Sequence, residues 1–181
     1  RFNEVELLKM NKLINEMKKL SEFDFPEEEV YGLLENSTLP KKDIIDYIHY
    51  DNAKYTRHLI YRDSLFELLL MCWKPGQKAP VHGHEGEKCF MRVEEGSLLF
   101  TKYTLESTQP LRLNMVDSIR GESGFLDGPA DLHSVENIYS QNAITFHLYA
   151  KPYHECDVYD IESGSIYRKK LVYDTMFKKP C

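Results

Sequence analysis

The sequence GQKAPVHGH at positions 76–84 decides the fold, because it places two histidines two residues apart on an extended segment. Side chains of such a segment alternate between its two faces, so His82 and His84 point the same way and can reach one metal ion. Pro75 and Gly76 form a turn signal at the start of the stretch, and Gly96 follows the polar residues after it. These turn-forming residues predict a strand, a tight bend and a second strand.

The length and charge of the chain exclude several classes of protein. With 181 residues, 42% of them hydrophobic, the chain is long enough for one globular domain with a real core. The net charge of −6 and the scattered Lys and Arg argue against nucleic-acid binding. The basic cluster at 168–170 is interpreted as a solvated face. The longest apolar run, 65–73, falls short of a membrane span and predicts a buried strand.

The cysteine pattern indicates free thiols, because the four cysteines form no CxxC pair and are not dense. We therefore expect an intracellular protein, cytoplasmic and monomeric, that contacts small molecules rather than nucleic acid or membrane.

The first fifty residues predict helices. Apolar residues recur with helical periodicity over 3–20. Pro26 is followed by three glutamates, which suit the first turn of a second helix. Pro40 opens a third candidate helix, through Ile48. Residues 1–50 are thus expected to form a helical cap on the core.

From Lys54 onward, short alternating runs are separated by turn residues. Nine such runs predict a sandwich or small barrel. We expect a single domain over 1–181, with the helical cap at 1–50 and the barrel and a C-terminal extension at 54–181. The expected strands are 54–61, 65–73, 79–84, 88–93, 97–103, 112–116, 131–136, 143–150 and 156–160.

The strand at 143–150 carries Thr145, His147 and Tyr149 on one face and apolar residues on the other. The polar face fits either a barrel lumen with chemistry or a surface in solvent. A third histidine, His133, follows a turn and precedes Asn137 by four positions. Alone it is typical of a structural histidine, but with the first pair it offers three imidazoles.

These spacings resemble the two cupin motifs. The first reads Gly-x5-His-x-His closed by Gly96, and the second joins Gly124 to His133-x3-Asn137. Cys89 stands where the usual first motif has a glutamate. With that exchange, the chain resembles the thiol dioxygenases, specifically the cysteine dioxygenase family, over roughly residues 55–164. Further matches are Tyr55-Thr56-Arg57, Cys72-Trp73 and His147-Leu148-Tyr149.

The resemblance implies a mainly β fold, a small cupin (jelly-roll) barrel with an N-terminal helical cap. It also implies a mononuclear Fe(II) bound by His82, His84 and His133. Three facial imidazoles would leave three open positions for the thiolate and amine of L-cysteine and for O2. The implied reaction converts L-cysteine to cysteine sulfinic acid.

Roles around the metal are likewise implied by the resemblance. Arg57 would bind the substrate carboxylate through its planar fork, with Tyr55 and Thr145 lining the pocket. Tyr149 would place its hydroxyl near the iron, supported by His147.

The resemblance further implies a thioether bond that joins Cys89 to Tyr149. The alternative for Cys89 is a purely structural role as a small, buried hydrophobic residue. Cys156 matches a family cysteine at the pocket mouth. The chain departs from the family at 150–152, where Ala-Lys-Pro replaces Ser-Pro-Pro.

Two other functions compete with cysteine oxidation. The first is oxidation of another small thiol acid, such as 3-mercaptopropionate. Arg57 favours cysteine, because family members with the other preference tend to carry Gln at that position. The second is a non-catalytic cupin that binds a metal or a small ligand.

Overall fold

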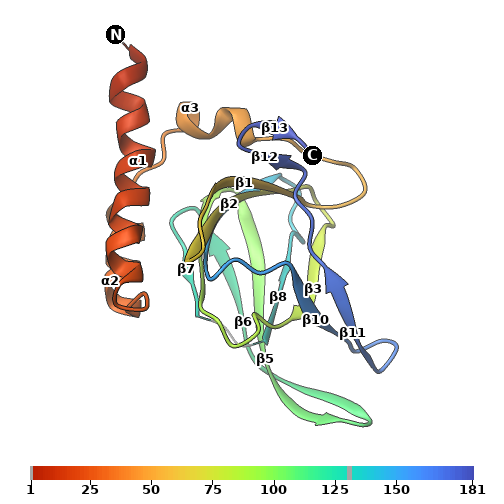
Figure 1. The fold of residues 1–181 in the computed structure, drawn as a ribbon. Helices are drawn as coiled ribbons and strands as arrows, with labels where there is room; N and C mark the ends of the chain where they lie inside the picture. The colour runs from red at the N-terminus through yellow and green to blue at the C-terminus, as the bar shows by residue number, and fades with distance from the viewer. Residues whose placement is uncertain (1, 130–131) are drawn as a thin grey trace.

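The computed structural model describes residues 2–129 and 132–181, with side chains from Lys9 onward. Figure 1 shows a β-barrel with helices on one side of it. The helices are α1 (Phe2–Ser21), α2 (Glu27–Asn36), α3 (Lys41–Ile44) and the 3-10 turn η1 (Ile45–Tyr47). The three expected helices are therefore present, the third being shorter than expected. The apolar side chains expected at positions 5–8 lie outside the described residues.

The strands form two sheets, in the orders β13-β12-β1-β2-β9-β4-β7 and β11-β10-β3-β8-β5-β6. All nine expected strands are present, although the first residue of the one expected at 131–136 lies outside the described residues. The strands are β1 (Thr56–Arg62), β2 (Phe66–Trp73), β3 (Lys78–His82), β4 (Cys89–Glu95), β5 (Ser97–Thr108), β6 (Leu111–Glu122), β7 (Leu126–Asp127), β8 (Leu132–Glu136), β9 (Ala143–Ala150), β10 (Glu155–Asp160), β11 (Ser165–Lys170), β12 (Thr175–Met176) and β13 (Lys179–Pro180).

Strand β2 is buried along its whole length, as the apolar run predicts. Its alternate residues serve two cores. Leu68 and Leu70 face the helices, whereas Leu69 and Met71 belong to the core between the two sheets. Because both faces are covered, the strand shows no polar alternation.

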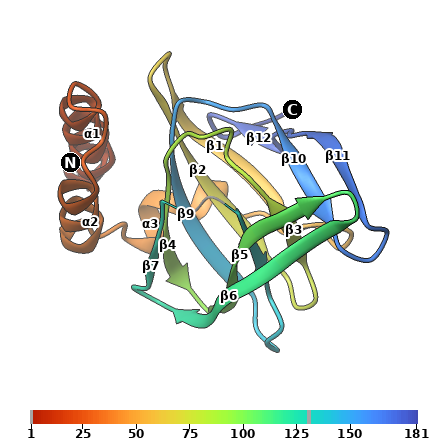
Figure 2. The same cartoon turned by 90° about the horizontal axis from the view of Figure 1, so that it is seen from below.

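The helices cover the outer face of the first sheet, where Figure 2 shows α1 and α2 beside β4 and β9. Met17 of α1 and Leu34 of α2 pack in one cluster with Phe146 and Leu148 of β9. The helical cap thus closes the barrel from outside and leaves the space between the sheets for other side chains. The result is the expected mainly β jelly-roll with an N-terminal cap.

The C-terminal strands β11 to β13 and the short β7 were not among the expected strands. Most side chains of β11 are exposed and many are charged, so the segment lacks a hydrophobic pattern. Its pairing with β10 over six residue pairs holds it in the sheet instead. Strand β12 pairs in parallel with β1, through His58 and Thr175. The C-terminal segment therefore returns to the first strand of the barrel.

All four cysteines have free thiols, as expected, and only Cys181 is exposed. Among residues 2–129 and 132–181, no helix combines the length and apolarity needed to cross a membrane.

Candidate metal centre

The three histidines meet at one wall of the barrel. His82 and His133 are cross-strand partners on β3 and β8, and their ring centroids lie 4.8 Å apart. The ring of His84 lies 5.1 Å from that of His82 and 4.8 Å from that of His133. One nitrogen from each ring lies within 4.8 Å of the others, a separation that suits a single metal ion.

The position of His84 differs from the expected one, because β3 ends at His82. His84 therefore lies in the loop after the strand, next to a turn where Glu85 has φ of 59° and Gly86 has φ of 79°. The backbone N–H of Glu87 donates to the carbonyl of His84 at 2.9 Å and closes this turn. The loop, and not strand alternation alone, brings the second imidazole to the first.

The tautomer of His82 suits a metal ligand. Its Nδ1 lies 2.7 Å from the carbonyl oxygen of Pro80, which can only accept, so Nδ1 carries the proton. This leaves Nε2 with a lone pair, as in metal sites where the other ring nitrogen donates to backbone. Burial, reinforced by His133 and His84, lowers the pKa of His82 well below its usual value. The ring is therefore neutral, as ligation requires.

A buried carboxylate that the sequence reasoning missed lies next to His133. Nδ1 of His133 lies 3.6 Å from Oδ2 of buried Asp127, and Lys102 holds the other oxygen of Asp127 at 3.0 Å. Burial alone would raise the pKa of Asp127, but His133 and Lys102 outweigh it and lower the pKa to about 2. An ionised carboxylate behind a ligating imidazole is common in metal sites. The donor set therefore fits a metal ion.

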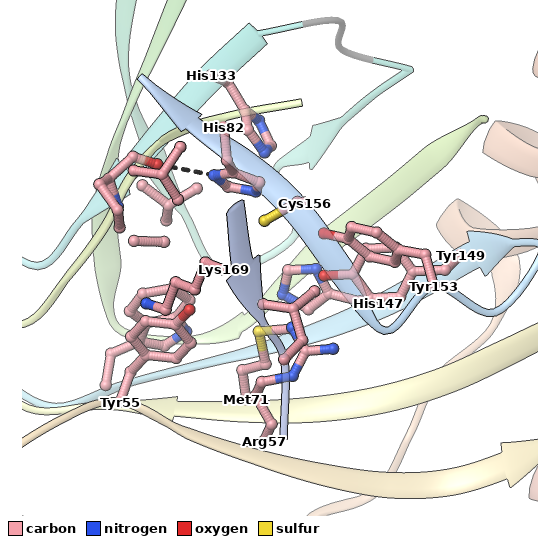
Figure 3. Close-up of a pocket in the computed structure, with 16 residues that line it drawn as sticks. Tyr55, Arg57, Met71, His82, His133, His147, Tyr149, Tyr153, Cys156 and Lys169 are labelled. Carbon is pink, nitrogen blue, oxygen red and sulfur yellow. Dashed lines mark hydrogen bonds between the residues drawn. The ribbon is translucent and has the colours of Figure 1, made fainter. Parts of the chain in front are cut away.

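A pocket opens beside the triad, and Figure 3 shows its labelled side chains. The predicted residues Tyr55, Arg57, His147 and Tyr149 line it together with His82 and His133. Cys156, expected at the mouth, lines it too. Thr145 and Cys89 lie behind this lining, in contact with His147 and Tyr149 respectively.

Arg57 supplies a buried positive charge to this pocket. Its side chain is 6% exposed, and its Nε and Nη2 have no hydrogen-bond partner among the described residues. Burial lowers the pKa of Arg57, but the phenols of Tyr149, Tyr153 and Tyr55 and the carboxylate of Glu67 raise it above its usual value. The guanidinium is charged, with donors available for an anion.

The polar face of β9 points into the barrel, which decides between its two interpretations. Thr145 and His147 are 0% and 4% exposed. The Thr145 hydroxyl lies 2.7 Å from Nε2 of His147 and accepts a hydrogen bond of 2.9 Å from the indole of Trp73. The His147 ring stacks on that of Tyr149, at 5.8 Å between centroids. This chain of contacts holds Tyr149 in the pocket.

Cys89 and Tyr149 are cross-strand partners on β4 and β9, so their side chains lie on the same face. Both are buried. Burial, with the charge of Asp127 adding to it, raises the pKa of the Cys89 thiol. At the Ala-Lys-Pro departure, the N–H of Lys151 donates to the carbonyl of Leu65 at 2.9 Å, a bond that a proline could not make.

The sequence reasoning missed two further residues of the pocket. The ring of Tyr153 lies 4.8 Å from that of Tyr149, and Figure 3 shows the two side by side. Lys169 lines the pocket from β11, although its cluster at 168–170 was interpreted as solvated. The only sequence signal for Tyr153 was its position four residues after Tyr149. Lys169 lies in a charged strand that has no pattern pointing to a pocket.

Known proteins resemble this chain over most of its length. A family model described as cysteine dioxygenase type I matches residues 6–162. Cysteine dioxygenase type 1 of Danio rerio is 29% identical over 146 residues, which cover 76% of this chain and 71% of that protein. The protein of the same name from Rattus norvegicus is 25% identical over 181 residues, covering 95% and 90%.

A solved structure of an uncharacterized conserved protein with a double-stranded beta-helix domain, from Klebsiella pneumoniae, is 14% identical. It covers 60% of this chain and 81% of its own, with a TM-score of 0.49. The family model spans the metal-site histidines, Arg57 and Tyr149. The chain belongs to the cysteine dioxygenase type I family.

Proposed function

We propose that this enzyme oxidises L-cysteine with O2 to cysteine sulfinic acid, using ferrous iron held by His82, His84 and His133. The observation that carries the proposal is that the buried Arg57 guanidinium shares a pocket with His82 and His133, two members of the three-imidazole group. The names of the relatives point to the same substrate. The reaction is balanced, because the thiol and both atoms of O2 become one sulfinic acid.

The donor set supports iron. Imidazole nitrogens suit Fe(II), and the triad contains no carboxylate. Bound iron would supply open coordination positions and the redox chemistry between thiol and O2. The protein supplies three imidazoles: the carbonyl of Pro80 fixes the tautomer of His82, and the carboxylate of Asp127 lies 3.6 Å from Nδ1 of His133.

Arg57 binds the substrate carboxylate in this proposal. Its unpaired Nε and Nη2 are adjacent donors of one planar fork, which matches the two oxygens of a carboxylate. The ring of Tyr55 stacks on that of Trp73 at 4.5 Å and forms part of the same wall. Binding the carboxylate would hold the thiol and amine toward the metal.

Tyr149 offers its hydroxyl to the bound substrate or to O2. Burial, together with Tyr153 and Cys89, raises the pKa of Tyr149 well above its usual value, so the phenol is a proton donor. His147 stacks on the ring and Thr145 holds His147 in turn. We also propose a Cys89–Tyr149 thioether, which would fix the ring. Forming it removes one hydrogen from each residue, with O2 as the oxidant.

The decisive experiment is anaerobic reconstitution with Fe(II), followed by O2 uptake and product analysis with L-cysteine. We expect uptake that depends on cysteine, with one sulfinic acid formed per O2. Fully loaded protein that binds cysteine without consuming O2 would contradict the proposal and favour a non-catalytic binding protein.

A second experiment separates cysteine from other thiol acids. Competition between L-cysteine and 3-mercaptopropionate measures the preference directly, and Arg57→Gln should weaken cysteine turnover more than that of the other acid. An enzyme that prefers 3-mercaptopropionate with Arg57 intact would overturn the substrate assignment.

We also propose that the whole chain forms a single domain and acts as a monomer. The free buried thiols support a reducing compartment such as the cytoplasm. Sedimentation velocity of the iron-loaded enzyme under turnover conditions measures its molecular mass and so tests the proposed monomer.

A further inference from the structure

Two tyrosine rings flank the guanidinium of Arg57. Its guanidinium carbon lies 5.8 Å from the ring centre of Tyr149 and 5.7 Å from that of Tyr173. Cation–π contacts of this kind gain strength when the pair is removed from water. Tyr149 is already part of the site, whereas Tyr173 comes from the segment between β11 and β12, beyond the residues that the family model matches.

The backbone fixes Tyr173 beside Arg57. The next residue, Asp174, accepts a hydrogen bond of 2.9 Å from the backbone N–H of Arg57. In return, the N–H of Asp174 donates to the carbonyl of Arg57 at 2.8 Å. Lys54 pairs with the other carboxylate oxygen of Asp174 at 2.7 Å. The position of Tyr173 is thus tied to the residue whose side chain it covers.

The hydroxyl of Tyr173 is held at its far end by a buried acid. It donates a hydrogen bond of 2.6 Å to Oε2 of Glu67, whose side chain is 0% exposed. Arg62 pairs with the same oxygen at 2.8 Å and also donates to the Tyr173 hydroxyl. Glu67 stands opposite Tyr149 in the β2–β9 register. The acid that anchors the Tyr173 ring is therefore the cross-strand neighbour of Tyr149.

The charges of this group are consistent with a fixed network. Burial, with Glu67 adding to it, raises the pKa of Tyr173, so the phenol keeps its proton and donates. The guanidinium carbon of Arg62 lies 5.1 Å from the ring centre of Tyr173. The ring therefore contacts two cations, and the buried carboxylate balances the charge of Arg62.

We propose that Tyr173 and Glu67 are positioning residues that orient the Arg57 guanidinium for the carboxylate of the substrate. A bidentate carboxylate contact requires the plane of the guanidinium to be held in register with the two oxygens. The network supplies that constraint from outside the pocket. The proposal rests on the proposed function, because it takes Arg57 as the carboxylate-binding residue.

The test compares two ligands that differ only in the group that Arg57 would hold. L-cysteine and cysteamine (2-aminoethanethiol) share the thiol and the amine, but cysteamine lacks the carboxylate. Their dissociation constants are measured by calorimetry on the ferrous enzyme without O2. A general disturbance of the fold or metal would weaken both ligands, whereas misorientation of Arg57 weakens L-cysteine alone.

Two variants of Tyr173 grade the effect. In Tyr173→Leu, which removes the ring, we expect L-cysteine binding to weaken by about tenfold and cysteamine binding by less than about twofold. Tyr173→Phe keeps the ring and loses the hydroxyl, so we expect an intermediate loss of about threefold for L-cysteine. Glu67→Gln should resemble Tyr173→Phe, because it leaves the ring in place but weakens its anchor.

Matched controls are available on the surface. Tyr167→Phe and Glu162→Gln repeat the same changes at exposed positions outside the pocket, and we expect neither to move the ratio of the two dissociation constants. If thermal unfolding shows that Tyr173→Leu or Glu67→Gln does not fold, the ratio of the two dissociation constants in Tyr173→Phe decides the positioning role.

An unchanged ratio in Tyr173→Phe and Tyr173→Leu, or an equal loss for both ligands, would overturn the positioning role. The binding ratio is independent of turnover. A wild-type enzyme that binds cysteine without oxidising it would refute the proposed function. The positioning role of Tyr173 and Glu67 would still be decided by the ratio of the L-cysteine and cysteamine dissociation constants.

Discussion

At the scale of single residues, the candidate metal centre includes side chains that stand behind the three histidines. Asp127 is one of these, because it lies behind His133 and is ionised well below neutral pH. Lys102 pairs with it from β5. The carboxylate lies 3.6 Å from Nδ1 of His133, and a negative charge there favours a ring orientation in which Nε2 would face a metal.

Replacing Asp127 should therefore weaken metal binding. We expect Asp127→Asn to lower metal affinity by roughly 10- to 100-fold, a range typical for such partners of ligating histidines. Competition with a metal chelator measures the affinity. Asp117→Asn, at an exposed position on β6, is the control and should leave the affinity unchanged. An Asp127→Asn enzyme with the affinity of the wild type would show that the carboxylate has no role in ligation.

The proposed thioether makes a prediction at the same scale. After turnover, we expect intact-mass analysis to show a fraction of the protein lighter by two hydrogens, because the bond forms between adjacent buried partners. Cys89→Ser should abolish that species. A mass change that persists in Cys89→Ser would place the modification elsewhere, and none in the wild type would remove the crosslink from the proposal.

At the scale of elements, some motif residues serve the fold and not the metal, because their hydrogen bonds join neighbouring strands. Asn137 of the second motif is fully buried. Its side-chain amide donates to the carbonyls of Trp73 and Gln141, at 3.3 and 2.8 Å. The backbone carbonyl of Asn137 accepts a hydrogen bond of 2.7 Å from the N–H of Gly76. Asn137 thereby joins the start of the histidine motif to β2.

Gly96, between β4 and β5, gives an element-scale prediction. Its φ is 81°, and a Cβ atom there would lie 2.4 Å from the carbonyl oxygen of Asn142. Gly86 has a similar φ of 79° but nothing within 4 Å of its added Cβ. Both alanine variants carry backbone strain of roughly 1–3 kcal/mol, but only Gly96→Ala adds a clash with backbone.

We therefore expect Gly96→Ala to lower the free energy of unfolding by at least about 1 kcal/mol more than Gly86→Ala does. Urea denaturation of the two variants measures the difference. Equal losses would mean that the loop at Asn142 moves aside without cost.

At the scale of the whole molecule, a metal held by the three histidines would join segments that are distant in the sequence. His82 and His84 come from β3 and its loop, and His133 comes from β8. A ligand that binds only the folded chain stabilises it by mass action. Metal held by all three histidines should therefore stabilise the barrel as a unit.

We expect free Fe(II) at about 100 times its dissociation constant to stabilise the protein by ~2.7 kcal/mol and raise Tm by about 5–10 °C. Anaerobic calorimetry with and without chelator measures the shift. His133→Ala is the control and should show almost none. A full shift in that variant would mean that the stabilising metal binds elsewhere.

The sequence by itself determined most of the barrel and the first set of site residues. Strands such as β2 and β9 were found because alternation and apolar runs are local properties of the chain. The three histidines that the structure brings together could be named because they lie at short, distinctive spacings within two motifs. Cys89 narrowed the family for the same reason, since it replaces a glutamate at a defined position in a motif.

Only the tertiary structure decided how distant segments complete the site. Strand β11 is mostly exposed and charged, so periodicity could not reveal it, yet it carries Lys169 to the pocket. The pairing of β12 with β1 brings Tyr173 to Arg57, more than one hundred residues away in the chain. Such contacts arise from sheet pairing between remote strands, which leaves no local pattern in the sequence. Glu67 is an example: the sequence shows an acid within an apolar run, but only the folded structure identifies Arg62 and Tyr173 as its partners.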